Sequence, residues 1–341
     1  MRSALPEDNQ SVDVALAPGA SLQAIQLPVR DKLDDVSRAM GAIVASDLPL
    51  VGQVSAHLLA MRGKLFRPTL LLLSSQVEGT PKKQAVTLAA ALELIHLATL
   101  VHDDAVDHSA LRRGMPTVNT LFSHQISVIM GDFLYSTALT HIVQLGDLEA
   151  LQALTRASTE MTLGEMRQLA VVHPLKFTER EYHALIRSKT ASLMRTACEL
   201  GALSGARKYS EALGNFGENL GMAFQIADDL LDYREVKETT GKPSGLDLRE
   251  HKVTLPLIHA LREMSASERK EVERLFASEE VSDDDIATVV RIVADNGGFE
   301  YAREREEEYA ERAHDALSGL PDTVARRSLS ASISYVMERH S

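Results

Sequence analysis

The sequence predicts an all-α fold built as one large domain. Leucine, alanine, methionine and glutamate dominate, and good helix formers recur at spacings of three and four residues. Runs of alternating β-branched residues, which are typical of strands, are scarce. The length of 341 residues alone suggests about two domains. However, no break in the chain has the composition of an interdomain linker, so we expect a single helical bundle.

Short breaks, in which glycine and proline interrupt the helical pattern, are expected to separate the helices. They read RGKLFRPT (62–69), EGTPKK (78–83), RRGMPT (112–117), VVHPLKFTER (171–180) and TTGKPSGLDLREHK (239–252). Residues 1–25 precede the first helical pattern and contain acids, prolines and glycine without a continuous apolar core, which argues against a secretory signal. We therefore expect a mobile or loosely docked arm at 1–25 and an all-α domain at 26–341.

The most apolar segment, AVTLAAALELIHLATLVH (85–102), approaches the length that spans a membrane. It contains Glu93 and His96 and runs into aspartates, and such polar groups are costly at bilayer depth. We expect a buried helix of a protein without a transmembrane segment. The acidic segments 277–290 and 301–317 are expected to be amphipathic helices with a solvated face.

Charge and cysteine content narrow the functional class. The formal net charge is −12, which argues against a nucleic-acid partner, because such surfaces need net positive charge. Any bound anion must be held by local positive charge or by metal. The single cysteine, Cys198, permits no internal disulfide and is expected to be a packing residue. This usage fits a reducing compartment, and we expect a cytoplasmic protein.

A first acidic cluster lies at the end of the apolar segment. Asp103 and Asp107 are four residues apart and share a helix face, and Asp104 lies about 100° around the helix. Three carboxylates at a helix C-terminus repel one another and oppose the helix dipole unless a partner compensates them. The alternative is a solvated acidic helix end, which explains poorly why the cluster extends a buried face.

A second cluster has the same spacing. Asp228, Asp229 and Asp232 end the apolar stretch GMAFQIADDLLDY (221–233), and Gln225 precedes them by almost one turn. Two such clusters that face each other across a bundle suit Mg2+, which takes oxygen ligands from carboxylates, water and substrate phosphates. The pair of clusters therefore indicates a site for metal and diphosphate.

Basic residues near the clusters supply partners for phosphate oxygens. Those concentrated near the first cluster in sequence are Lys64, Arg67, Arg112 and Arg113. Those in or beside other breaks are Lys189, next to Thr190, and Lys242 and Lys252. Each taken alone is more often a surface charge than a ligand, so the hypothesis depends on the whole set.

The motifs that carry these residues resemble those of the trans-polyprenyl diphosphate synthases. They occur in the family's order from about residue 30 onward: GKLFRP (63–68), LIHLATLVHDDAVDHSALRRGMPTVN (94–119), GDFLYSTA (131–138), KTASL (189–193), GMAFQIADDLLDY (221–233) and GKPSGLDLREHKVTLPLI (241–258). The resemblance implies a helical bundle of the isoprenoid synthase type around a central apolar cavity, and a homodimer. It also implies Mg2+-dependent head-to-tail condensation of isopentenyl diphosphate with an allylic diphosphate.

The resemblance also implies roles for individual residues. Metal ligands are Asp103 and Asp107 for two Mg2+ ions and Asp228 for a third, with Asp104, Asp229 and Asp232 in support. The isopentenyl diphosphate would be held without metal by Lys64, Arg67, His96 and Arg113. The allylic diphosphate would be held by Arg112, Lys189, Lys242 and Lys252. The developing allylic cation would be stabilised by Thr190 and Gln225, with Gln168 nearby. One departure is His251, which stands where the family usually has glycine.

Positions just before the first cluster act in this family as a floor for the growing chain. Here they are Ala98 and Thr99, both small. One helix turn rises about 5.4 Å, comparable to one isoprene unit, so small residues predict a long product, from heptaprenyl to decaprenyl, as used for quinone side chains. A product of this length would be released at a membrane surface. Geranylgeranyl and farnesyl products remain alternatives, because Ala98 and Thr99 can instead serve close helix packing.

Three other classes of protein share some of these features. A terpene cyclase has the first motif but normally has a different second metal motif. A metal phosphohydrolase of the His-Asp type needs further histidine ligands, and His96 and His108 do not form a convincing set. A non-catalytic synthase subunit loses the aspartates, which this chain keeps.

Overall fold

The computed structural model describes residues 19–61, 63–234 and 245–338. Its first part contains α2 (Leu22–Gln26), η1 (Leu27–Val29), α3 (Arg30–Ile43), α4 (Pro49–Ala60), α5 (Phe66–Ser75), α6 (Gln84–Val106), α7 (Val118–Leu121), α8 (His124–Gln144) and α9 (Leu148–Leu169). Between α6 and α7 lies the antiparallel hairpin of β1 (Leu111–Arg112) and β2 (Met115–Pro116), which pairs Leu111 with Pro116.

The second part continues with η2 (Pro174–Lys176), α10 (Glu179–Ile186), the π-helical turn η3 (Arg187–Ala191), α11 (Ser192–Gly205), η4 (Arg207–Tyr209), α12 (Ser210–Arg234), α13 (Leu246–Arg249), α14 (Leu255–Glu263), α15 (Ala266–Ala277), α16 (Asp283–Asp295), α17 (Gly298–Ala316) and α18 (Val324–Met337). The two short strands are the only ones among the described residues, which confirms the predicted all-α class.

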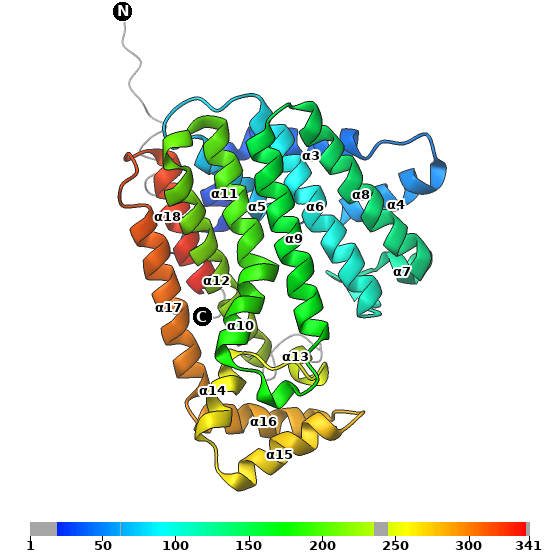
Figure 1. Ribbon diagram of the computed structural model, residues 1–341, viewed down its shortest axis with the longest axis vertical. Coiled ribbons are helices and arrows are strands. Elements are labelled where there is room, and N and C mark those ends of the chain that lie inside the picture. Colours follow the sequence, from blue (N-terminus) through cyan, green and yellow to red (C-terminus); the bar gives the residue numbers. More distant parts are fainter. Residues whose placement is uncertain (1–18, 62, 235–244, 339–341) are drawn as a thin grey trace, which may run out of the picture.

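Long helices form the body of the molecule, and α15 and α16 lie together at one end of it (Figure 1). The apolar segment predicted to be buried forms α6, which packs against α3, α5 and α8. Its interior residues Leu88, Leu92 and Ile95 are completely buried. The core therefore surrounds the helix that carries the first acidic cluster.

Close helix contacts depend on glycine at two positions near the acidic clusters. A Cβ atom on Gly131 of α8 would lie 2.2 Å from the His102 ring on α6, and one on Gly221 of α12 would lie 2.6 Å from Ala191 of η3. A larger residue at Gly221 would meet the Ala191 backbone and push α12 away from η3, whereas one at Gly131 would displace the His102 ring. Gly221 therefore sets the spacing between η3 and α12, which carry Thr190 and Gln225.

The last residues of the predicted N-terminal arm form part of helix α2. Within the segment 1–25 that the sequence predicts to be mobile or loosely docked, residues 19–25 are described. Ser21 caps α2 through a hydrogen bond from Ala24 N–H, and Ile25 is completely buried. Helix α2 packs against α18 near the other end of the chain. The boundary at residue 25 therefore falls within a packed helix and remains a prediction.

Helices α6 and α8 are both long and apolar enough to cross a membrane by length and composition. Core helices of globular proteins meet the same criterion. In α6, 61% of the most apolar window is buried inside the protein, as expected for a core helix, whereas in α8 only 33% is buried. Most of the apolar window of α8 is therefore not buried inside this single chain.

Candidate active site

The C-terminal end of α6 presents the first acidic cluster. The helix ends at Val106, and the N–H of its capping residue Asp107 donates a hydrogen bond to the Asp103 carbonyl oxygen at 2.8 Å. His108 follows with a φ of 52°, a left-handed conformation that ends the helix. Asp103 is half-buried and Asp107 is exposed. The two carboxylates expected to bind Mg2+ therefore lie at the C-terminal end of α6.

Asp104 has a different role from its neighbours. It is buried, and Arg112 Nε donates hydrogen bonds to both of its carboxylate oxygens, at 2.8 and 2.9 Å. Burial raises the pKa of Asp104, and the charge of Arg112 opposes this shift. The pair ties strand β1 to α6 and positions Arg112 beside the cluster.

The electrostatic surroundings of Asp103 include groups from two other elements. The pKa of Asp103 is raised to about 6. Burial is the largest cause, the charges of Glu165 and Asp107 also raise the pKa, and those of Lys189 and Arg112 lower it. Glu165 lies on α9 and Lys189 on η3. The structure therefore brings Lys189, expected to hold the allylic diphosphate, into electrostatic range of the first cluster.

Two side chains of α9 hold Lys189. Its ammonium group forms an ion pair with Glu165 at 2.8 Å and donates a hydrogen bond to Gln168 Oε1 at 2.7 Å. Gln168 was expected near the reacting centre, and Glu165 was not. Because the lysine has two acceptors on one helix, its ammonium group is fixed in position before any diphosphate binds.

The second acidic cluster is held by a chain of side-chain hydrogen bonds. Asp229 is buried and accepts from the Tyr182 hydroxyl at 2.6 Å and from Gln225 Nε2 at 2.9 Å. The Gln225 oxygen in turn accepts from the Thr190 hydroxyl at 2.7 Å. Burial raises the pKa of Asp229 well above its ordinary value. Asp229 thus orients Gln225 and Thr190, while Asp228 is exposed.

Asp232 anchors the segment that follows α12. Its carboxylate accepts hydrogen bonds from the backbone N–H groups of Leu246 and Asp247, at 3.0 and 3.1 Å. Burial and the nearby charge of Asp232 raise the pKa of Asp247 to about 7. Asp232 therefore holds the start of α13 against the second cluster, in addition to any part it has in metal binding.

Lys252 connects the surroundings of the two clusters. Burial lowers its pKa, but a hydrogen bond to Glu250 and the charges of Glu250, Asp107 and Asp247 raise it overall. Asp107 belongs to the first cluster, and Asp247 is held by Asp232 of the second. Lys252 is thus within electrostatic range of both. Among the described residues, no three His, Cys, Asp or Glu side chains converge tightly enough to hold a metal by themselves. Any metal there would also need water or substrate oxygens, which is how Mg2+ is ordinarily bound.

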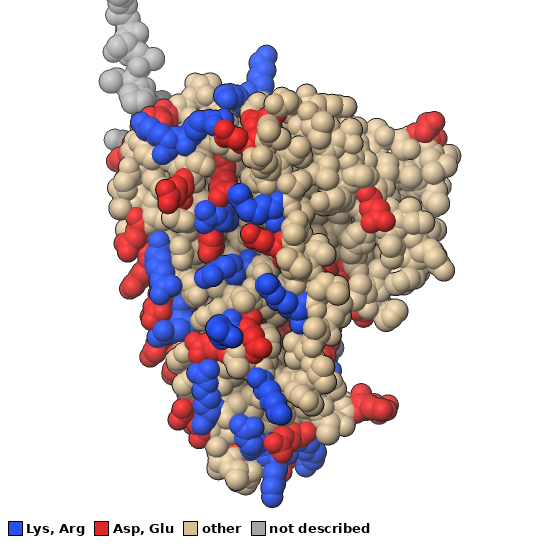
Figure 2. Space-filling model, in the orientation of Figure 1, with Lys and Arg blue, Asp and Glu red and all other residues tan. Residues whose placement is uncertain are grey.

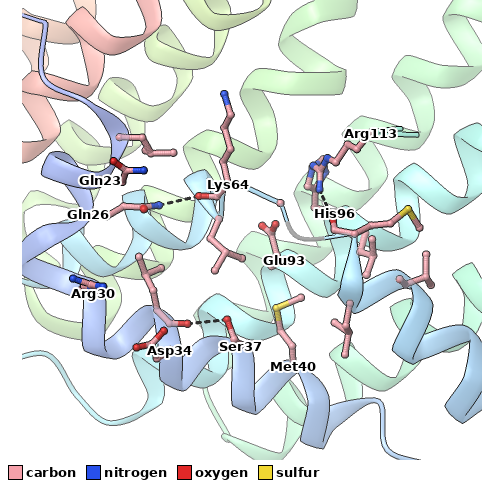
Figure 3. Close-up of a pocket in the computed structure, with 18 of the residues that line it drawn as sticks. Gln23, Gln26, Arg30, Asp34, Ser37, Met40, Lys64, Glu93, His96 and Arg113 are labelled. Atoms are coloured by element: carbon pink, nitrogen blue, oxygen red, sulfur yellow. Dashed lines mark hydrogen bonds between the residues drawn. The ribbon is translucent and has the colours of Figure 1, made fainter. Parts of the chain in front are cut away.

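A second group of basic side chains lies in a cavity of about 1050 Å3 between α2, α3, α4 and α6. Lys64, His96 and Arg113 line it (Figure 3). Arg67 adjoins them, because its Nη1 donates to His96 Nε2 at 2.9 Å. Burial, reinforced by Arg67, Arg113 and Arg112, lowers the pKa of His96 well below its usual range, so the imidazole is neutral. The structure thus brings together the four residues expected to hold isopentenyl diphosphate.

Glu93 lies among these basic groups and was not expected in the site. It is buried on α6 and lines the cavity, and its Oε2 atom has no hydrogen-bond partner. Burial raises its pKa, while the charges of Arg67 and Arg113 lower it. Arg113 is itself fixed by donating to the Met61 carbonyl oxygen at 2.9 Å. A carboxylate here balances the charge of two arginines that converge on one site.

Other predicted residues are placed less directly. Lys242 lies outside the described residues. Ala98 is buried, and the Thr99 hydroxyl donates to the His96 carbonyl oxygen at 2.7 Å. His251 has a φ of 54°, in the left-handed region that glycine enters without strain. This backbone conformation gives a physical reason for the glycine that the family usually has there.

Sequence reasoning missed Glu93, Glu165, Tyr182 and Asp247. Two of them had a usable signal: Glu93 is three residues before His96 on one helix, and Glu165 is three before Gln168, so each pair shares a face. Tyr182 and Asp247 act across the fold, and no local spacing reveals their contacts with the second cluster.

Comparisons with known proteins agree with this arrangement. Residues 48–293 match the model of the family described as polyprenyl synthetase. An all-trans-nonaprenyl-diphosphate synthase (geranyl-diphosphate specific) from Rhodobacter capsulatus is 38% identical over 309 residues, which cover 90% of this chain and 94% of that protein. The octaprenyl diphosphate synthase of Escherichia coli (strain K12) is 36% identical over 91% of this chain and 96% of its own.

A solved structure extends the likeness to three dimensions. It is a polyprenyl synthase from Caulobacter crescentus CB15 complexed with calcium and isoprenyl diphosphate. It superimposes with a TM-score of 0.88 at 34% identity and covers 94% of this chain and 98% of its own.

Proposed function

This chain belongs to the polyprenyl synthetase family, and from that premise we propose that it is a trans-polyprenyl diphosphate synthase. It condenses isopentenyl diphosphate head-to-tail with an allylic diphosphate. The product is a long chain, from heptaprenyl to decaprenyl, used for quinone side chains. The named relatives make products of this class.

The observation that carries the proposal is that the charged groups form two separate places for diphosphates. One lies between the two acidic clusters, where Lys189 and Lys252 are the nearby cations. The other is the basic cavity, which contains Lys64 and Arg113 and needs no metal to attract an anion. A condensation of two diphosphates needs two such places, whereas a hydrolase or a cyclase needs one.

The acidic clusters fit Mg2+ because they offer carboxylate oxygens from two helices, and we propose three ions in each active site. Bound Mg2+ would neutralise the charge that develops on the departing diphosphate. The calcium and isoprenyl diphosphate in the relative from Caulobacter support a divalent metal at such a site.

The protein's own groups act around that leaving diphosphate. Lys189, already held by α9, supplies positive charge at a fixed position and needs no reorganisation during ionisation. The Thr190 and Gln225 oxygens, oriented by Asp229, stabilise the allylic cation. The basic cavity orients isopentenyl diphosphate, whose double bond attacks that cation. The carbocation that results then loses a proton to the departing diphosphate, which forms the new double bond. The surrounding apolar helices exclude water, which would otherwise quench the cation.

The direct test is a condensation assay. Purified protein is incubated with Mg2+, labelled isopentenyl diphosphate and farnesyl diphosphate, and the dephosphorylated products are separated by chromatography. We expect linear alcohols of 35 to 50 carbons, the lengths of heptaprenyl to decaprenyl chains. A cyclic hydrocarbon or free phosphate alone would overturn the proposal, and a 20-carbon alcohol would restrict it to the geranylgeranyl class.

We also propose that the protein is a homodimer that uses the exposed face of α8. Val128, Ile129 and Val143 are exposed on this helix, and Asp132 is its only acidic or basic residue apart from histidines. In Figure 2, the right-hand part of the molecule, which includes α8, carries few charged side chains, whereas both signs crowd the left and lower parts. A charge-poor apolar face of this kind is typical of subunit interfaces.

Light scattering coupled to size-exclusion chromatography tests the dimer. Ile129→Asp should convert a dimer into monomers, because an unpaired charge would be buried at the interface. Leu48→Asp is the matched control. Leu48 is, like Ile129, an exposed aliphatic residue, but it lies at the start of α4 and not on α8. A wild-type monomer, or a dimer that survives Ile129→Asp, would exclude this interface.

For location, we propose that the enzyme acts in the cytoplasm and releases its product at a membrane surface. The single buried cysteine and a product of long hydrocarbon chain length support this assignment. Cell fractionation should find the protein in the cytosolic fraction. Vesicles added to the condensation assay should raise turnover if product release limits it.

A further inference from the structure

A second pocket, of about 570 Å3, is formed by α10, the first residue of η3 and the end of α14. It shares no lining residue with the basic cavity between α2, α3, α4 and α6. Apart from Ala184, its described lining residues are polar or charged, and they are Thr178, Glu179, Arg180, His183, Arg187 and Arg262. Because polar side chains lose their hydrogen bonds to water under an apolar chain, this lining suits a charged, water-soluble ligand.

Helical spacing explains why these side chains meet. Glu179, His183 and Arg187 follow one another at intervals of four residues, so they lie along one face of α10 and the turn after it. Tyr182 lies about 100° around the helix and is buried, with its hydroxyl bound to Asp229. Helix α10 therefore presents the pocket on one face and supports the second acidic cluster with another.

The formal charge of the lining is positive, because three arginines stand against the single carboxylate of Glu179. Both oxygens of that carboxylate are already bound, one by the Tyr301 hydroxyl at 2.7 Å and the other by Arg262 at 2.9 Å. Arg187 pairs with Glu218 through Nε at 3.1 Å. Since a guanidinium group has five N–H donors, Arg187 and Arg262 can each keep a glutamate and still bind an anion.

His183 supplies independent support for a ligand. Its Nε2 atom is buried and has no hydrogen-bond partner, which is rare for a buried polar atom. Tyr309 packs edge-on against the ring, with centroids 5.8 Å apart. Burial lowers the pKa of His183, and nearby arginines outweigh the opposite effect of Glu179, so the imidazole is neutral. A neutral imidazole with its proton on Nε2 can donate a hydrogen bond to an anion oxygen.

We propose that this pocket, lined by Arg180, Arg187, Arg262 and His183, binds a free polyphosphate anion, with inorganic diphosphate as its natural ligand. Guanidinium groups match phosphate oxygens geometrically, and three of them beside one imidazole donor suit a short phosphate chain. Ala184 is the only aliphatic side chain among the described lining residues, so a nucleobase would gain little there. Inorganic diphosphate is the coproduct of each condensation step, and this choice of source rests on the proposed function.

Occupancy of the pocket lowers turnover in this proposal. Helices α10 and α14 are in contact (Figure 1), and an anion bound to arginines of both would draw them together. Tyr182 moves with α10, so its hydrogen bond to Asp229 would shift. Arg187 also lies two residues before Lys189, which supplies positive charge to the leaving diphosphate. Diphosphate would therefore inhibit without competing with either substrate.

Arginine modification locates the binding without turnover. Phenylglyoxal modifies exposed arginines, and peptide mass spectrometry reports each position separately. In EDTA, diphosphate at ten times its half-maximal concentration fills about nine-tenths of the sites, so modification of Arg180 and Arg262 should slow about tenfold. Arg156 is the internal control, because its side chain is 55% exposed and pairs with a glutamate of another helix, whereas that of Arg262 is 51% exposed and similarly paired. Arg113 reports separately on the basic cavity.

Other anions separate the sources of phosphate in the same experiment. Orthophosphate at equal ionic strength should protect at least about tenfold less well than diphosphate, because it makes fewer charged hydrogen bonds. ATP should protect no better than tripolyphosphate. ATP that protects more than about tenfold better would overturn the inorganic assignment, and equal protection of Arg156 would overturn the site.

Steady-state kinetics tests the effect on turnover. At saturating substrates and constant free Mg2+, competition in the active site is overcome, so diphosphate should lower the kcat of the wild type only through the pocket. Arg180→Gln and Arg262→Gln should each shift this inhibition to about tenfold higher diphosphate, the scale of losing one charged hydrogen bond. Both variants should keep the wild-type initial kcat without added diphosphate, and Arg156→Gln should behave as the wild type throughout.

Two kinetic results would overturn the inference: a wild-type kcat that diphosphate does not change, or inhibition that is the same in all variants. A wild type without condensation activity would instead overturn the proposed function. In that case the protection of Arg180 and Arg262 in EDTA would still decide whether the pocket binds polyphosphate.

Discussion

The Thr190 hydroxyl donates a hydrogen bond of 2.7 Å to the Gln225 side-chain oxygen, although the two residues lie 35 positions apart. Thr190 lies in the π-helical turn η3 and Gln225 in α12, and the pair is buried or half-buried between these elements. Because Gln225 is bound in turn to Asp229, the geometry of the second acidic cluster is transmitted to the two residues that we propose stabilise the allylic cation.

This network predicts the effect of Tyr182→Phe. The change removes one of two hydrogen bonds to the buried Asp229 carboxyl group and should cost about 1–3 kcal/mol. If that loss falls on the transition state, kcat drops about tenfold, since 1.4 kcal/mol is one factor of ten. The KM for isopentenyl diphosphate should not change. Tyr135→Phe, on α8, is the control and should retain kcat; an unchanged kcat in Tyr182→Phe would show that the network is structural only.

Removing a metal ligand should have a larger effect. Asp103→Ala and Asp228→Ala should each lower kcat by ~10²–10³, the scale of losing one contact that stabilises charge in the transition state. Asp295→Ala, at the exposed end of α16, should retain full activity in the same assay. Retained turnover in both cluster variants would mean that the metals bind elsewhere.

The raised pKa of Asp103 makes a prediction about stability without metal. Its pKa is about 6 in the fold, against an ordinary value of 3.8, because burial penalises the charged form. The charged residue therefore destabilises the metal-free fold above pH 6, and this penalty disappears as pH falls toward 3.8. In EDTA, the Tm of Asp103→Asn should exceed that of the wild type at about pH 7.5, and the difference should shrink at about pH 4.5. A difference that does not depend on pH would refute this assignment.

Binding of Mg2+ with diphosphate should stabilise the fold. A ligand at a hundredfold excess over its Kd adds about 2.7 kcal/mol to the free energy of unfolding. Thermal unfolding with Mg2+ alone, and with diphosphate in EDTA, provides the controls. If the full mixture raises Tm no more than either control, the acidic clusters do not form a joint site.

Product length should respond to the residues before the first cluster. Ala98→Phe should shorten the product, as an aromatic ring there would close the channel for the growing chain. Ala98 is buried, so the larger ring is also expected to cost about 1–3 kcal/mol of stability through overpacking. The Tm of the variant should therefore be measured alongside its products. An unchanged product from a folded variant would show that Ala98 does not line the channel.

Helical periodicity and motif order were sufficient to predict the all-α class, the burial of α6 and the approach of Lys189 and Lys252 to the acidic clusters. They could not predict which side chains bind each carboxylate of the two clusters. Asp104 and Asp229 have the same positions in their motifs, but the first binds an arginine and the second a tyrosine and a glutamine. The glutamine lies one turn earlier on the same helix, a spacing that the sequence does reveal. The arginine comes from a hairpin and the tyrosine from another helix, and these tertiary contacts leave no local pattern in the sequence.

The π-helical turn at Arg187–Ala191 has a consequence for anyone who aligns or redesigns this chain. Such a turn accommodates one additional residue without breaking the helix, so the apolar repeat before it is out of phase with the repeat after it. Deleting a single residue there would regularise the backbone yet rotate Tyr182 by about 100° relative to α11. The variant with this shortened, regular helix is therefore expected to be inactive.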